Sequence, residues 1–510
     1  MMQMNTTNEK ERNIIIRILV KKSFLLCLFI FCACIFSDKS FATPDSARTI
    51  PPEYQKETPK KKPRLPSQRL GITINPASIL KLPPLDTAPL LAEDAAQGHG
   101  PARIGVHRDL NVSPETHGEW HDIDGRGRIW LFGIHAPDAK GFRIHFSQCY
   151  LPKGAHIYVY SPSRLDKYEG PYRYCKWVGT VWDNTVIVEL VVPVLTDPSP
   201  SFVIDKIGHM YRSVNQQLLP RKTLRQDGGP CRVDAACYPE WAIDGDAVGL
   251  VEFEKMGQFA VCSGTMLDNQ AEDYTPYFLT AEHCIASDAV ADTARIYWFY
   301  ETSACNGSPS DLNSVPKSEN AMLLASKTDI DFSVLEILGS VPRSLSWAKW
   351  SLTEPETGDS GVGLHHPGGT FLGNDDYRRI LFGNIASSST DYMWYIDHCL
   401  GGTETGSSGS PFFNSSHQII GQLSGGTGVP CSPDDQSKYG KFSLSYPYMQ
   451  TLLQGGSDDE LEDNDLRSSA TEVEDEVYKS QVVKIYDEDW CKISVPENTK
   501  ISVDLSFIHT

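Results

Sequence analysis

The 510-residue sequence contains no apolar run long enough to cross a membrane as a helix. Its most apolar segment, residues 24–36, has about 13 residues, whereas a membrane-spanning helix needs about 20. Excess positive charge is also absent, because 46 Lys and Arg stand against 65 Asp and Glu, for a formal net charge of −19. Phosphate binding needs a basic face, so we expect no nucleic-acid partner.

Several chemical signatures are missing as well. The sequence has no repeat of solenoid period, no EF-hand spacing and no Gly-x-Ser-x-Gly in a strand–helix pattern, which disfavours an α/β esterase. The adjacent His365 and His366 would point to opposite faces of a strand and could not easily share one ion. Six other histidines lack the spacing of metal ligands and are expected in packing or surface roles: His107, His117, His121, His135, His145 and His156. We predict neither a metal site nor a cofactor.

The N-terminus is typical of a secretory signal peptide. Basic residues precede the apolar segment, and the small residues Ser40 and Ala42 suit cleavage after Ala42. A membrane anchor is the alternative. Removal of residues 1–42 takes away three of the 13 cysteines, and the remaining ten suit the disulfides of an exported protein. We expect a secreted product, extracellular or periplasmic, that no longer contacts the membrane.

The rest of the chain has an all-β texture divided by connectors. Residues 43–102 are rich in proline and lysine and are predicted to form a mobile linker. Residues 103–225 contain β-branched and aromatic runs split by Gly and Pro, which predict a β-rich domain. A second strand-rich domain is expected over residues 226–455, and an acidic segment follows over residues 456–510.

Three short motifs in the second strand-rich domain carry the chemistry. Residues 278–284 end an apolar strand at His283, beside a cysteine. In residues 329–337 an acid leads directly into a buried strand, and residues 406–411 (Gly-Ser-Ser-Gly-Ser-Pro) hold a glycine-flanked serine on a tight turn. A serine hydroxyl becomes a good nucleophile when an imidazole takes its proton, and the imidazole needs a carboxylate to fix its tautomer. Together the three motifs predict a serine hydrolase.

Residues 231–450 resemble the trypsin/chymotrypsin-fold serine proteases, and most of all the bacterial lysyl endopeptidases. The matching motifs lie at residues 280–284, 331–336, 365–367 and 406–411. The resemblance implies two six-stranded β-barrels with His283 as general base, Asp331 rather than Asp329 as orienting acid, and Ser408 as nucleophile. The N–H groups of Gly406 and Ser408 would form the oxyanion hole.

The resemblance also implies a set of disulfides. The family pairs would be Cys231–Cys431, Cys237–Cys305 and Cys262–Cys284. Cys399 has no family partner, so it is either a free thiol or bridged to Cys491. In the first β-rich domain Cys149 and Cys175 are the only cysteines and are candidates for a further pair.

The specificity pocket departs from the family pattern. Ser424, Gly425 and Gly426 correspond to the strand that binds the substrate backbone, with Ser424 in place of a histidine. Ser437 stands where lysyl endopeptidases place the aspartate that selects a cationic side chain, and Asp435 just upstream could supply the charge instead. Trypsin's own acid corresponds to Gly402. Without a carboxylate, uncharged P1 residues would be preferred.

The family spacing favours a basic P1, because it places the mature start at Gln226, directly after Arg225. Residues 103–225 then resemble a propeptide that aids folding and holds the enzyme latent. Residues 456–510 resemble part of a bacterial pre-peptidase C-terminal β-sandwich domain, with a solvated acidic tail as the alternative. We predict a secreted serine endopeptidase that acts on proteins or peptides without cofactor. The alternative is a non-catalytic, protease-like binding or adhesion protein.

Overall fold

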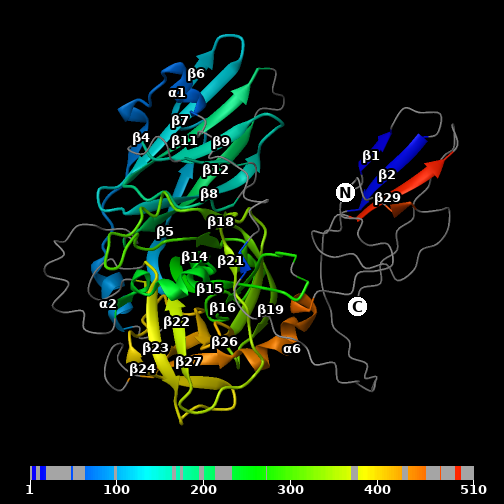
Figure 1. Ribbon diagram of the computed structural model, residues 1–510. Coiled ribbons are helices and arrows are strands. Elements are labelled where there is room, and N and C mark those ends of the chain that lie inside the picture. The colour runs from blue at the N-terminus through cyan, green and yellow to red at the C-terminus, as the bar shows by residue number, and fades with distance from the viewer. Residues whose placement is uncertain are drawn as a thin grey trace. The chain divides into compact units, whose positions relative to one another are not determined.

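The computed structural model divides into two compact units, residues 43–454 and residues 1–42 with 455–510 (Figure 1). It describes residues 3–6, 12–18, 48–49, 64–96, 100–162, 168–172, 176–194, 200–212, 232–271, 273–368, 377–427, 435–454, 471–472 and 489–495. The smaller unit contains one sheet in the order β1-β2-β29-β28. Its strands are β1 Gln3–Thr6, β2 Arg12–Ile18, β28 Thr471–Glu472 and β29 Asp489–Val495. The apolar segment at residues 24–36 lies outside the described residues, and no described helix has the length and apolarity of a membrane span.

The large unit begins with a β-sandwich. One sheet runs β10-β9-β11-β7-β4, with β6 also on β7, and the other places β12 between β5 and β8. Trp130, Phe132, Phe146 and Phe202 fill the core between the sheets. The strands are β4 Ile79–Lys81, β5 Ala102–Val112, β6 Glu119–Ile123, β7 Gly127–His135, β8 Gly141–Tyr150, β9 His156–Tyr160, β10 Tyr168–Tyr172, β11 Thr185–Pro193 and β12 Ser201–Met210.

Part of the segment expected to be a mobile linker is packed against this sandwich. Residues 64–96 form α1 Pro66–Leu70, a 3₁₀ turn at Pro76–Ser78, β4 and α2 Ala88–Ala96, and β4 pairs in parallel with β7. Leu65 is buried, and Ser67 donates to the buried carboxylate of Glu189 through its N–H (3.0 Å) and its hydroxyl (2.6 Å). These contacts give the segment a fixed place, which its proline-rich composition alone did not predict.

Two barrels follow the sandwich. The first has the strand order β18-β17-β14-β15-β16-β20-β19, and the second runs β23-β22-β25-β26-β27-β24 and closes through a β23–β24 pairing, with β13 on β23. The first set is β14 Val248–Lys255, β15 Gln258–Leu267, β16 Tyr277–Thr280, β17 Arg295–Tyr297, β18 Lys317–Glu319, β19 Ala321–Lys327 and β20 Phe332–Ile337. The second set is β13 Val233–Asp234, β22 Ser360–His365, β23 Arg379–Ile385, β24 Met393–Leu400, β25 Pro411–Asn414, β26 Ile419–Gly426 and β27 Gln436–Lys441. This all-β arrangement agrees with the predicted fold class.

Short elements complete the large unit. β21 Ser346–Trp347 pairs with β3 Arg48–Thr49. Two 3₁₀ turns, Ala235–Cys237 and Pro239–Trp241, lead into α4 Ala242–Gly245. The helix α5 Asp288–Ala291 follows β16, and α6 Phe442–Leu453 closes the unit by burying Phe442 and Met449 in the main core.

Strand β5 joins the sandwich to the first barrel. Along one edge it pairs with β12 of the sandwich, and along the other its first residues pair with β15 of the barrel. Ala102 lies opposite Val261 and Arg103 opposite Ala260, so one continuous sheet passes from one structure into the other (Figure 1). The N-terminal end of β5 therefore lies against the first barrel.

Candidate active site

His283 and Asp331 meet because the strands that carry them are neighbours. β16 and β20 pair in antiparallel fashion, with Thr280 opposite Ser333, so the end of β16 lies beside the start of β20. His283 follows β16 and Asp331 immediately precedes β20. This pairing brings together two side chains that are 48 positions apart in the sequence.

The Asp331 carboxylate contacts His283 twice. One oxygen accepts from the His283 backbone N–H at 2.9 Å, and the other lies 2.7 Å from Nδ1 of the ring. Asp331 is buried and has a φ of +56°, a left-handed conformation that Asp tolerates better than most residues. Asp329, the other candidate acid, is exposed and instead pairs with Lys327 at 3.3 Å.

Ser408 lies on the turn before β25, at the contact between the two barrels. Its carbonyl accepts from the N–H of Ser263 on β15 at 2.8 Å, which ties the turn to the first barrel. At the neighbouring Gly409, where φ is +83°, a Cβ atom would lie 2.3 Å from Oγ1 of Thr280 at the end of β16. Only glycine allows this close approach between the serine turn and the histidine loop.

The histidine ring has one nitrogen still available. Nε2 of His283 is buried and has no hydrogen-bond partner among the described residues. The candidate nucleophile, Ser408, is also buried, with 1% of its surface exposed. The Cys262–Cys284 disulfide ties the residue after His283 to β15. Cys262, His283 and Cys284 form a close group of metal-ligand types, but both sulfurs are committed to the bridge, so this group does not have the thiolates that a metal would need.

The other expected disulfides have mixed outcomes. Cys237 and Cys305 are bridged. Cys149 is disulfide-bonded, but its expected partner Cys175 lies outside the described residues, as do Cys231 and Cys431. Among the described cysteines Cys399 is free and exposed, in line with the first of its two expectations.

The residues expected at the substrate pocket lie on adjacent strands. Ser424, Gly425 and Gly426 are on β26, where Gly426 pairs with Ser437 of β27. Ser437 is fully buried, and its hydroxyl contacts two side chains, Oγ1 of Thr403 at 2.7 Å and Nε2 of His398 at 2.8 Å. Asp435, directly before β27, is 3% exposed. Gly402 is buried next to Thr403.

His365 and His366 are both buried near this region. Nδ1 of His365 lies 2.8 Å from the hydroxyl of Ser407, next to the candidate nucleophile. Burial, with the nearby His366, Arg379 and His398, lowers the pKa of His365 to about 3, so the ring is neutral at ordinary pH. His366 stacks on Tyr300. Both rings therefore have packing contacts of the kind expected for structural histidines.

Comparisons with known proteins agree with these features. Residues 225–443 match the family described as lysyl endopeptidase, C-terminal domain. A lysyl endopeptidase of Pseudomonas aeruginosa is 27% identical over 383 residues, which cover 66% of this chain and 77% of that protein. Residues 225–443 are therefore similar to the C-terminal domain of lysyl endopeptidases, and this similarity supports a serine endopeptidase.

Solved structures that match part of the chain are more distant. They include the HtrA-type protease AlgW with a tripeptide, at 18% identity and a TM-score of 0.28, and a serine endoprotease from Yersinia pestis, at 20% identity and a TM-score of 0.30. The alignments cover 42% of this chain and 63% and 66% of those chains, respectively.

Sequence reasoning missed some neighbours of the candidate site. Thr403 and His398 lie against Ser437 but belong to no motif, and only the register of β24 on β27 brings His398 there. It also missed Gly100, whose carbonyl accepts a 2.8 Å hydrogen bond from the N–H of Gly406. Gly100 is about 300 positions away in the sequence, so no local signal could reveal this contact.

Proposed function

We propose that this chain is a secreted serine endopeptidase, made as a preproenzyme, in which Ser408, His283 and Asp331 perform acyl transfer. Ser408 Oγ attacks the carbonyl carbon of the peptide bond while Nε2 of His283 takes its proton. The Asp331 carboxylate holds the Nδ1 proton and stabilises the imidazolium. His283 then gives the proton to the leaving amine, and water hydrolyses the acyl-enzyme by the same route in reverse.

The observation that carries this proposal is the double contact of Asp331 with His283, at 2.7 and 2.9 Å. It fixes the ring tautomer so that Nε2 is the basic nitrogen, and that nitrogen is the one without a partner among the described residues. The N–H groups of Gly406 and Ser408 would stabilise the developing oxyanion. Gly406 has a φ of +89°, a conformation that glycine adopts without strain.

A labelling experiment tests the nucleophile. The processed protein is treated with a fluorophosphonate, which phosphonylates active serines with loss of fluoride, and the modified peptide is identified by mass spectrometry. We expect modification of Ser408, loss of both labelling and peptide hydrolysis in Ser408→Ala, and wild-type behaviour in the control Ser416→Ala, which changes an exposed serine of the next turn. Absence of labelling in processed wild type would favour the alternative of a non-catalytic, protease-like binding or adhesion protein.

For P1 we propose a preference for Lys and Arg, with Asp435 as the carboxylate. Its support is the burial of Asp435 two residues before Ser437, together with the Arg225–Gln226 junction at the expected mature start. The competing hypothesis is a preference for uncharged P1 residues, because the pocket residue Ser437 carries no charge and its hydroxyl is hydrogen-bonded to Thr403 and His398.

A substrate panel separates the two readings. Peptides that differ only in P1 (Lys, Arg, Ala, Leu or Glu) are compared by kcat/KM for wild type and Asp435→Asn. A basic preference that Asp435→Asn abolishes supports the assignment, with a loss of up to about 100-fold for the cationic substrates, the scale of a lost charge-assisted contact. Retention of the preference in Asp435→Asn rejects Asp435, and preference for an uncharged P1 rejects the basic pocket.

We also propose that residues 1–42 direct export and that residues 103–225 act as the propeptide. The basic and apolar pattern before Ala42 supports the first assignment. Fractionation followed by N-terminal sequencing of the exported protein tests both assignments. We expect one species that starts at Thr43 and a mature one that starts at Gln226, whereas recovery of an intact N-terminus in the membrane fraction contradicts signal cleavage.

A further inference from the structure

A segment from outside the protease domain contacts the candidate oxyanion hole. The N–H of Gly406 donates a hydrogen bond to the carbonyl oxygen of Gly100 at 2.8 Å. Gly100 is buried and lies just before β5 of the sandwich. An N–H group that should be free to bind the substrate carbonyl is therefore occupied by the chain itself.

The residues after Gly100 continue along the edge of the first barrel. Ala102 and Arg103 pair in antiparallel fashion with Val261 and Ala260 of β15. On the other side, a Cβ atom at Gly368 would lie 2.0 Å from Cβ of Ala102, so the segment fits closely against the second barrel as well. This is the way an extended peptide adds to a free strand edge.

The sandwich anchors this segment firmly. Arg103 is 8% exposed and its guanidinium contacts Asp94 at 2.8 Å, Glu93 at 2.9 Å and the hydroxyl of Tyr211 at 3.0 Å. Asp94 also pairs with Arg212 at 2.8 Å. The residues that follow Gly100 therefore have contacts to both the sandwich and the barrel.

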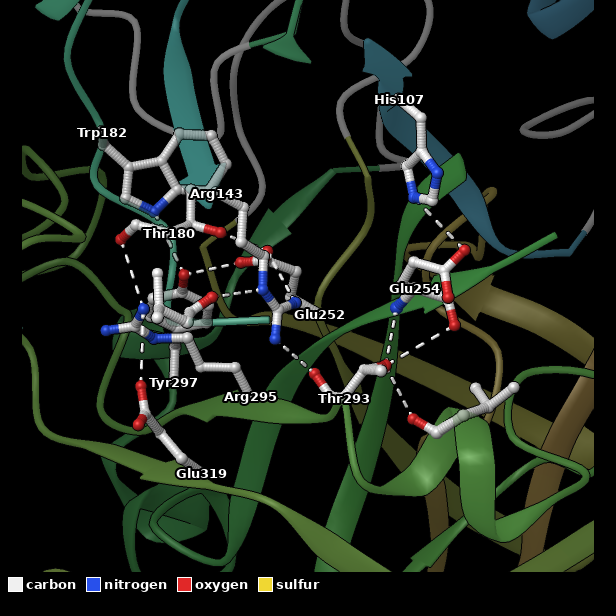
Figure 2. Close-up of polar contacts among 12 residues, drawn as sticks. His107, Arg143, Thr180, Trp182, Glu252, Glu254, Thr293, Arg295, Tyr297 and Glu319 are labelled. Atoms are coloured by element: carbon white, nitrogen blue, oxygen red, sulfur yellow. Dashed lines mark hydrogen bonds and ion pairs between the residues drawn. The ribbon is translucent and has the colours of Figure 1, made fainter. Parts of the chain in front are cut away.

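A second, buried network holds the sandwich on the same barrel (Figure 2). Arg143 of β8 reaches Glu252 of β14 at 3.3 Å and donates to the carbonyl of Thr293 at 2.7 Å. Glu252 also accepts from the hydroxyls of Tyr297 (2.7 Å) and Thr180. At the margin, His107 of β5 lies 3.3 Å from Glu254. None of these contacts involves residues 213–231.

We propose that residues 100–103, here called the strap, occupy the active-site cleft as an uncut substrate mimic and keep the enzyme latent. This rests on the proposed function, because it takes the Gly406 N–H as part of the oxyanion hole. The carbonyl of Gly100 takes the place of the carbonyl to be attacked, and Pro101 to Arg103 lie on the side of the leaving group. The strap lies at the start of the sandwich, far in the sequence from the expected processing site at Arg225–Gln226.

Two features explain why the strap is not cut. Cleavage would join Ser408 Oγ to the Gly100 carbonyl carbon and break the bond to the Pro101 nitrogen, which must receive a proton from His283. That nitrogen carries a ring carbon in place of hydrogen, and the ring fixes its conformation. Gly100 also has a φ of +133°, a backbone conformation that an L-residue of an ordinary substrate rarely adopts. The backbone that presents this carbonyl to Ser408 therefore differs from the backbone of an ordinary substrate.

A consequence is that activation needs two events. Cleavage anywhere in residues 213–231 leaves the strap, the Arg103 contacts and the Arg143–Glu252 network intact, because all of them lie outside that segment. The cut chain therefore stays inhibited until the sandwich dissociates or is digested.

The test uses the full chain and one small change. Gly100→Ala adds a methyl group at φ +133° and should loosen the strap, so the fluorophosphonate should label Ser408 about tenfold faster than in wild type. The matched control is Gly125→Ala, which also has a positive φ (+66°) but lies on a sandwich turn with open space around it. The control should label as slowly as wild type. Circular dichroism and the elution volume of each variant verify that it is folded.

A second measurement tests the two-event activation. Wild type is cut between the domains, and the two fragments are passed through a size-exclusion column. We expect them to co-elute and to remain slow to label until the N-terminal fragment is digested.

The outcomes separate the strap from the proposed function. If intact wild type and Gly100→Ala are labelled equally fast, the strap proposal is wrong, but the assignment of Ser408 as nucleophile is supported. The same conclusion follows if wild type is labelled fast immediately after cleavage between the domains. No labelling of any form, including the fully processed chain, overturns the proposed function itself.

Discussion

At the scale of single residues, the position of Asp331 depends on its backbone. Its φ of +56° directs the carboxylate back toward His283 at the residue just before β20 begins. Asp329, two residues earlier, is 64% exposed and faces Lys327 instead. Two acids that look nearly equivalent in the sequence therefore have different surroundings, and the difference can be measured.

Asp331→Asn should reduce kcat by about 10⁴-fold, because the amide cannot hold the ring in the tautomer that leaves Nε2 basic. The change keeps the size of the side chain, so folding should be preserved. Steady-state hydrolysis of a peptide amide measures the effect. The matched control Asp329→Asn should stay within about twofold of wild type, since an exposed ion pair contributes little. A similar loss in both variants would contradict the assignment.

A second residue-scale prediction concerns His365. Burial lowers its pKa from 6.5 to about 3, so between these values the unfolded chain binds a proton that the folded chain does not. Stability should therefore fall as pH is lowered from about 6.5 to about 3, with the unfolding constant of the protease domain rising up to about tenfold per pH unit from this group. Urea unfolding at pH 7 and 4.5 measures the slope.

In His365→Gln the neutral amide can still contact Ser407 but cannot titrate, so the loss of stability between pH 7 and 4.5 should be smaller. His117→Gln, a change on an exposed turn, is the control. An unchanged slope in His365→Gln would show that other groups dominate this pH range.

Each residue of the proposed triad lies in a short local motif of the sequence, and the structure brings two of them, His283 and Asp331, into contact. The neighbours of the proposed pocket could not be predicted in this way, because Ser437 meets His398 only through the pairing of β24 with β27. Register between distant strands depends on the whole core, and a window of a few residues does not contain it.

At the scale of elements, β5 explains both what was predicted and what was missed. The pattern of residues 103–225 predicts a β-rich domain, and β5 is one of its strands. Nothing in that pattern says that its first residues leave the sandwich and pair with β15. The same holds for residues 64–96, where proline content suggested a linker but Leu65 and Ser67 are buried. Composition predicts local stiffness, whereas packing depends on partners elsewhere in the chain.

The Arg143–Glu252 contact is the element-scale prediction. Both side chains are buried, so Arg143→Met leaves the Glu252 carboxylate without its cation and should weaken the association of sandwich and barrel by roughly 3–5 kcal/mol. After cleavage between the domains, the two fragments should separate at concentrations at which the wild-type pair co-elutes. Lys153→Met, which removes an equal charge from an exposed turn, is the control. Persistent co-elution in Arg143→Met would assign the association to the strand pairing alone.

At the scale of the whole molecule, about half of the net charge lies in one part of the chain and the proposed catalytic residues lie in another. From residue 458 onward there are 15 acidic and 5 basic residues, which account for −10 of the net charge of −19. His283, Asp331 and Ser408 all belong to the other unit, which ends at Gln454. The overall acidity therefore says little about the substrate.

A chain that stops after Gln454 should keep its kcat/KM within about twofold, because His283, Asp331 and Ser408 and their described contacts all lie in residues 43–454. Its elution from an anion exchanger should shift to lower salt. The control is a chain that stops after Lys441, which loses α6 with Phe442 and Met449 and should not fold. A large loss of activity in the chain that stops after Gln454 would give residues 455–510 a catalytic role.

The sharing of β5 between sandwich and barrel also has a consequence in time. Roughly 160 residues separate Ala102 from Val261, so at about 5–20 residues per second the ribosome completes β5 roughly 8–30 s before its partner on β15. On the strap proposal, the inhibitory segment is therefore synthesised before the domain that it would inhibit. The proposed catalytic residues would then fold against a site that the strap already covers.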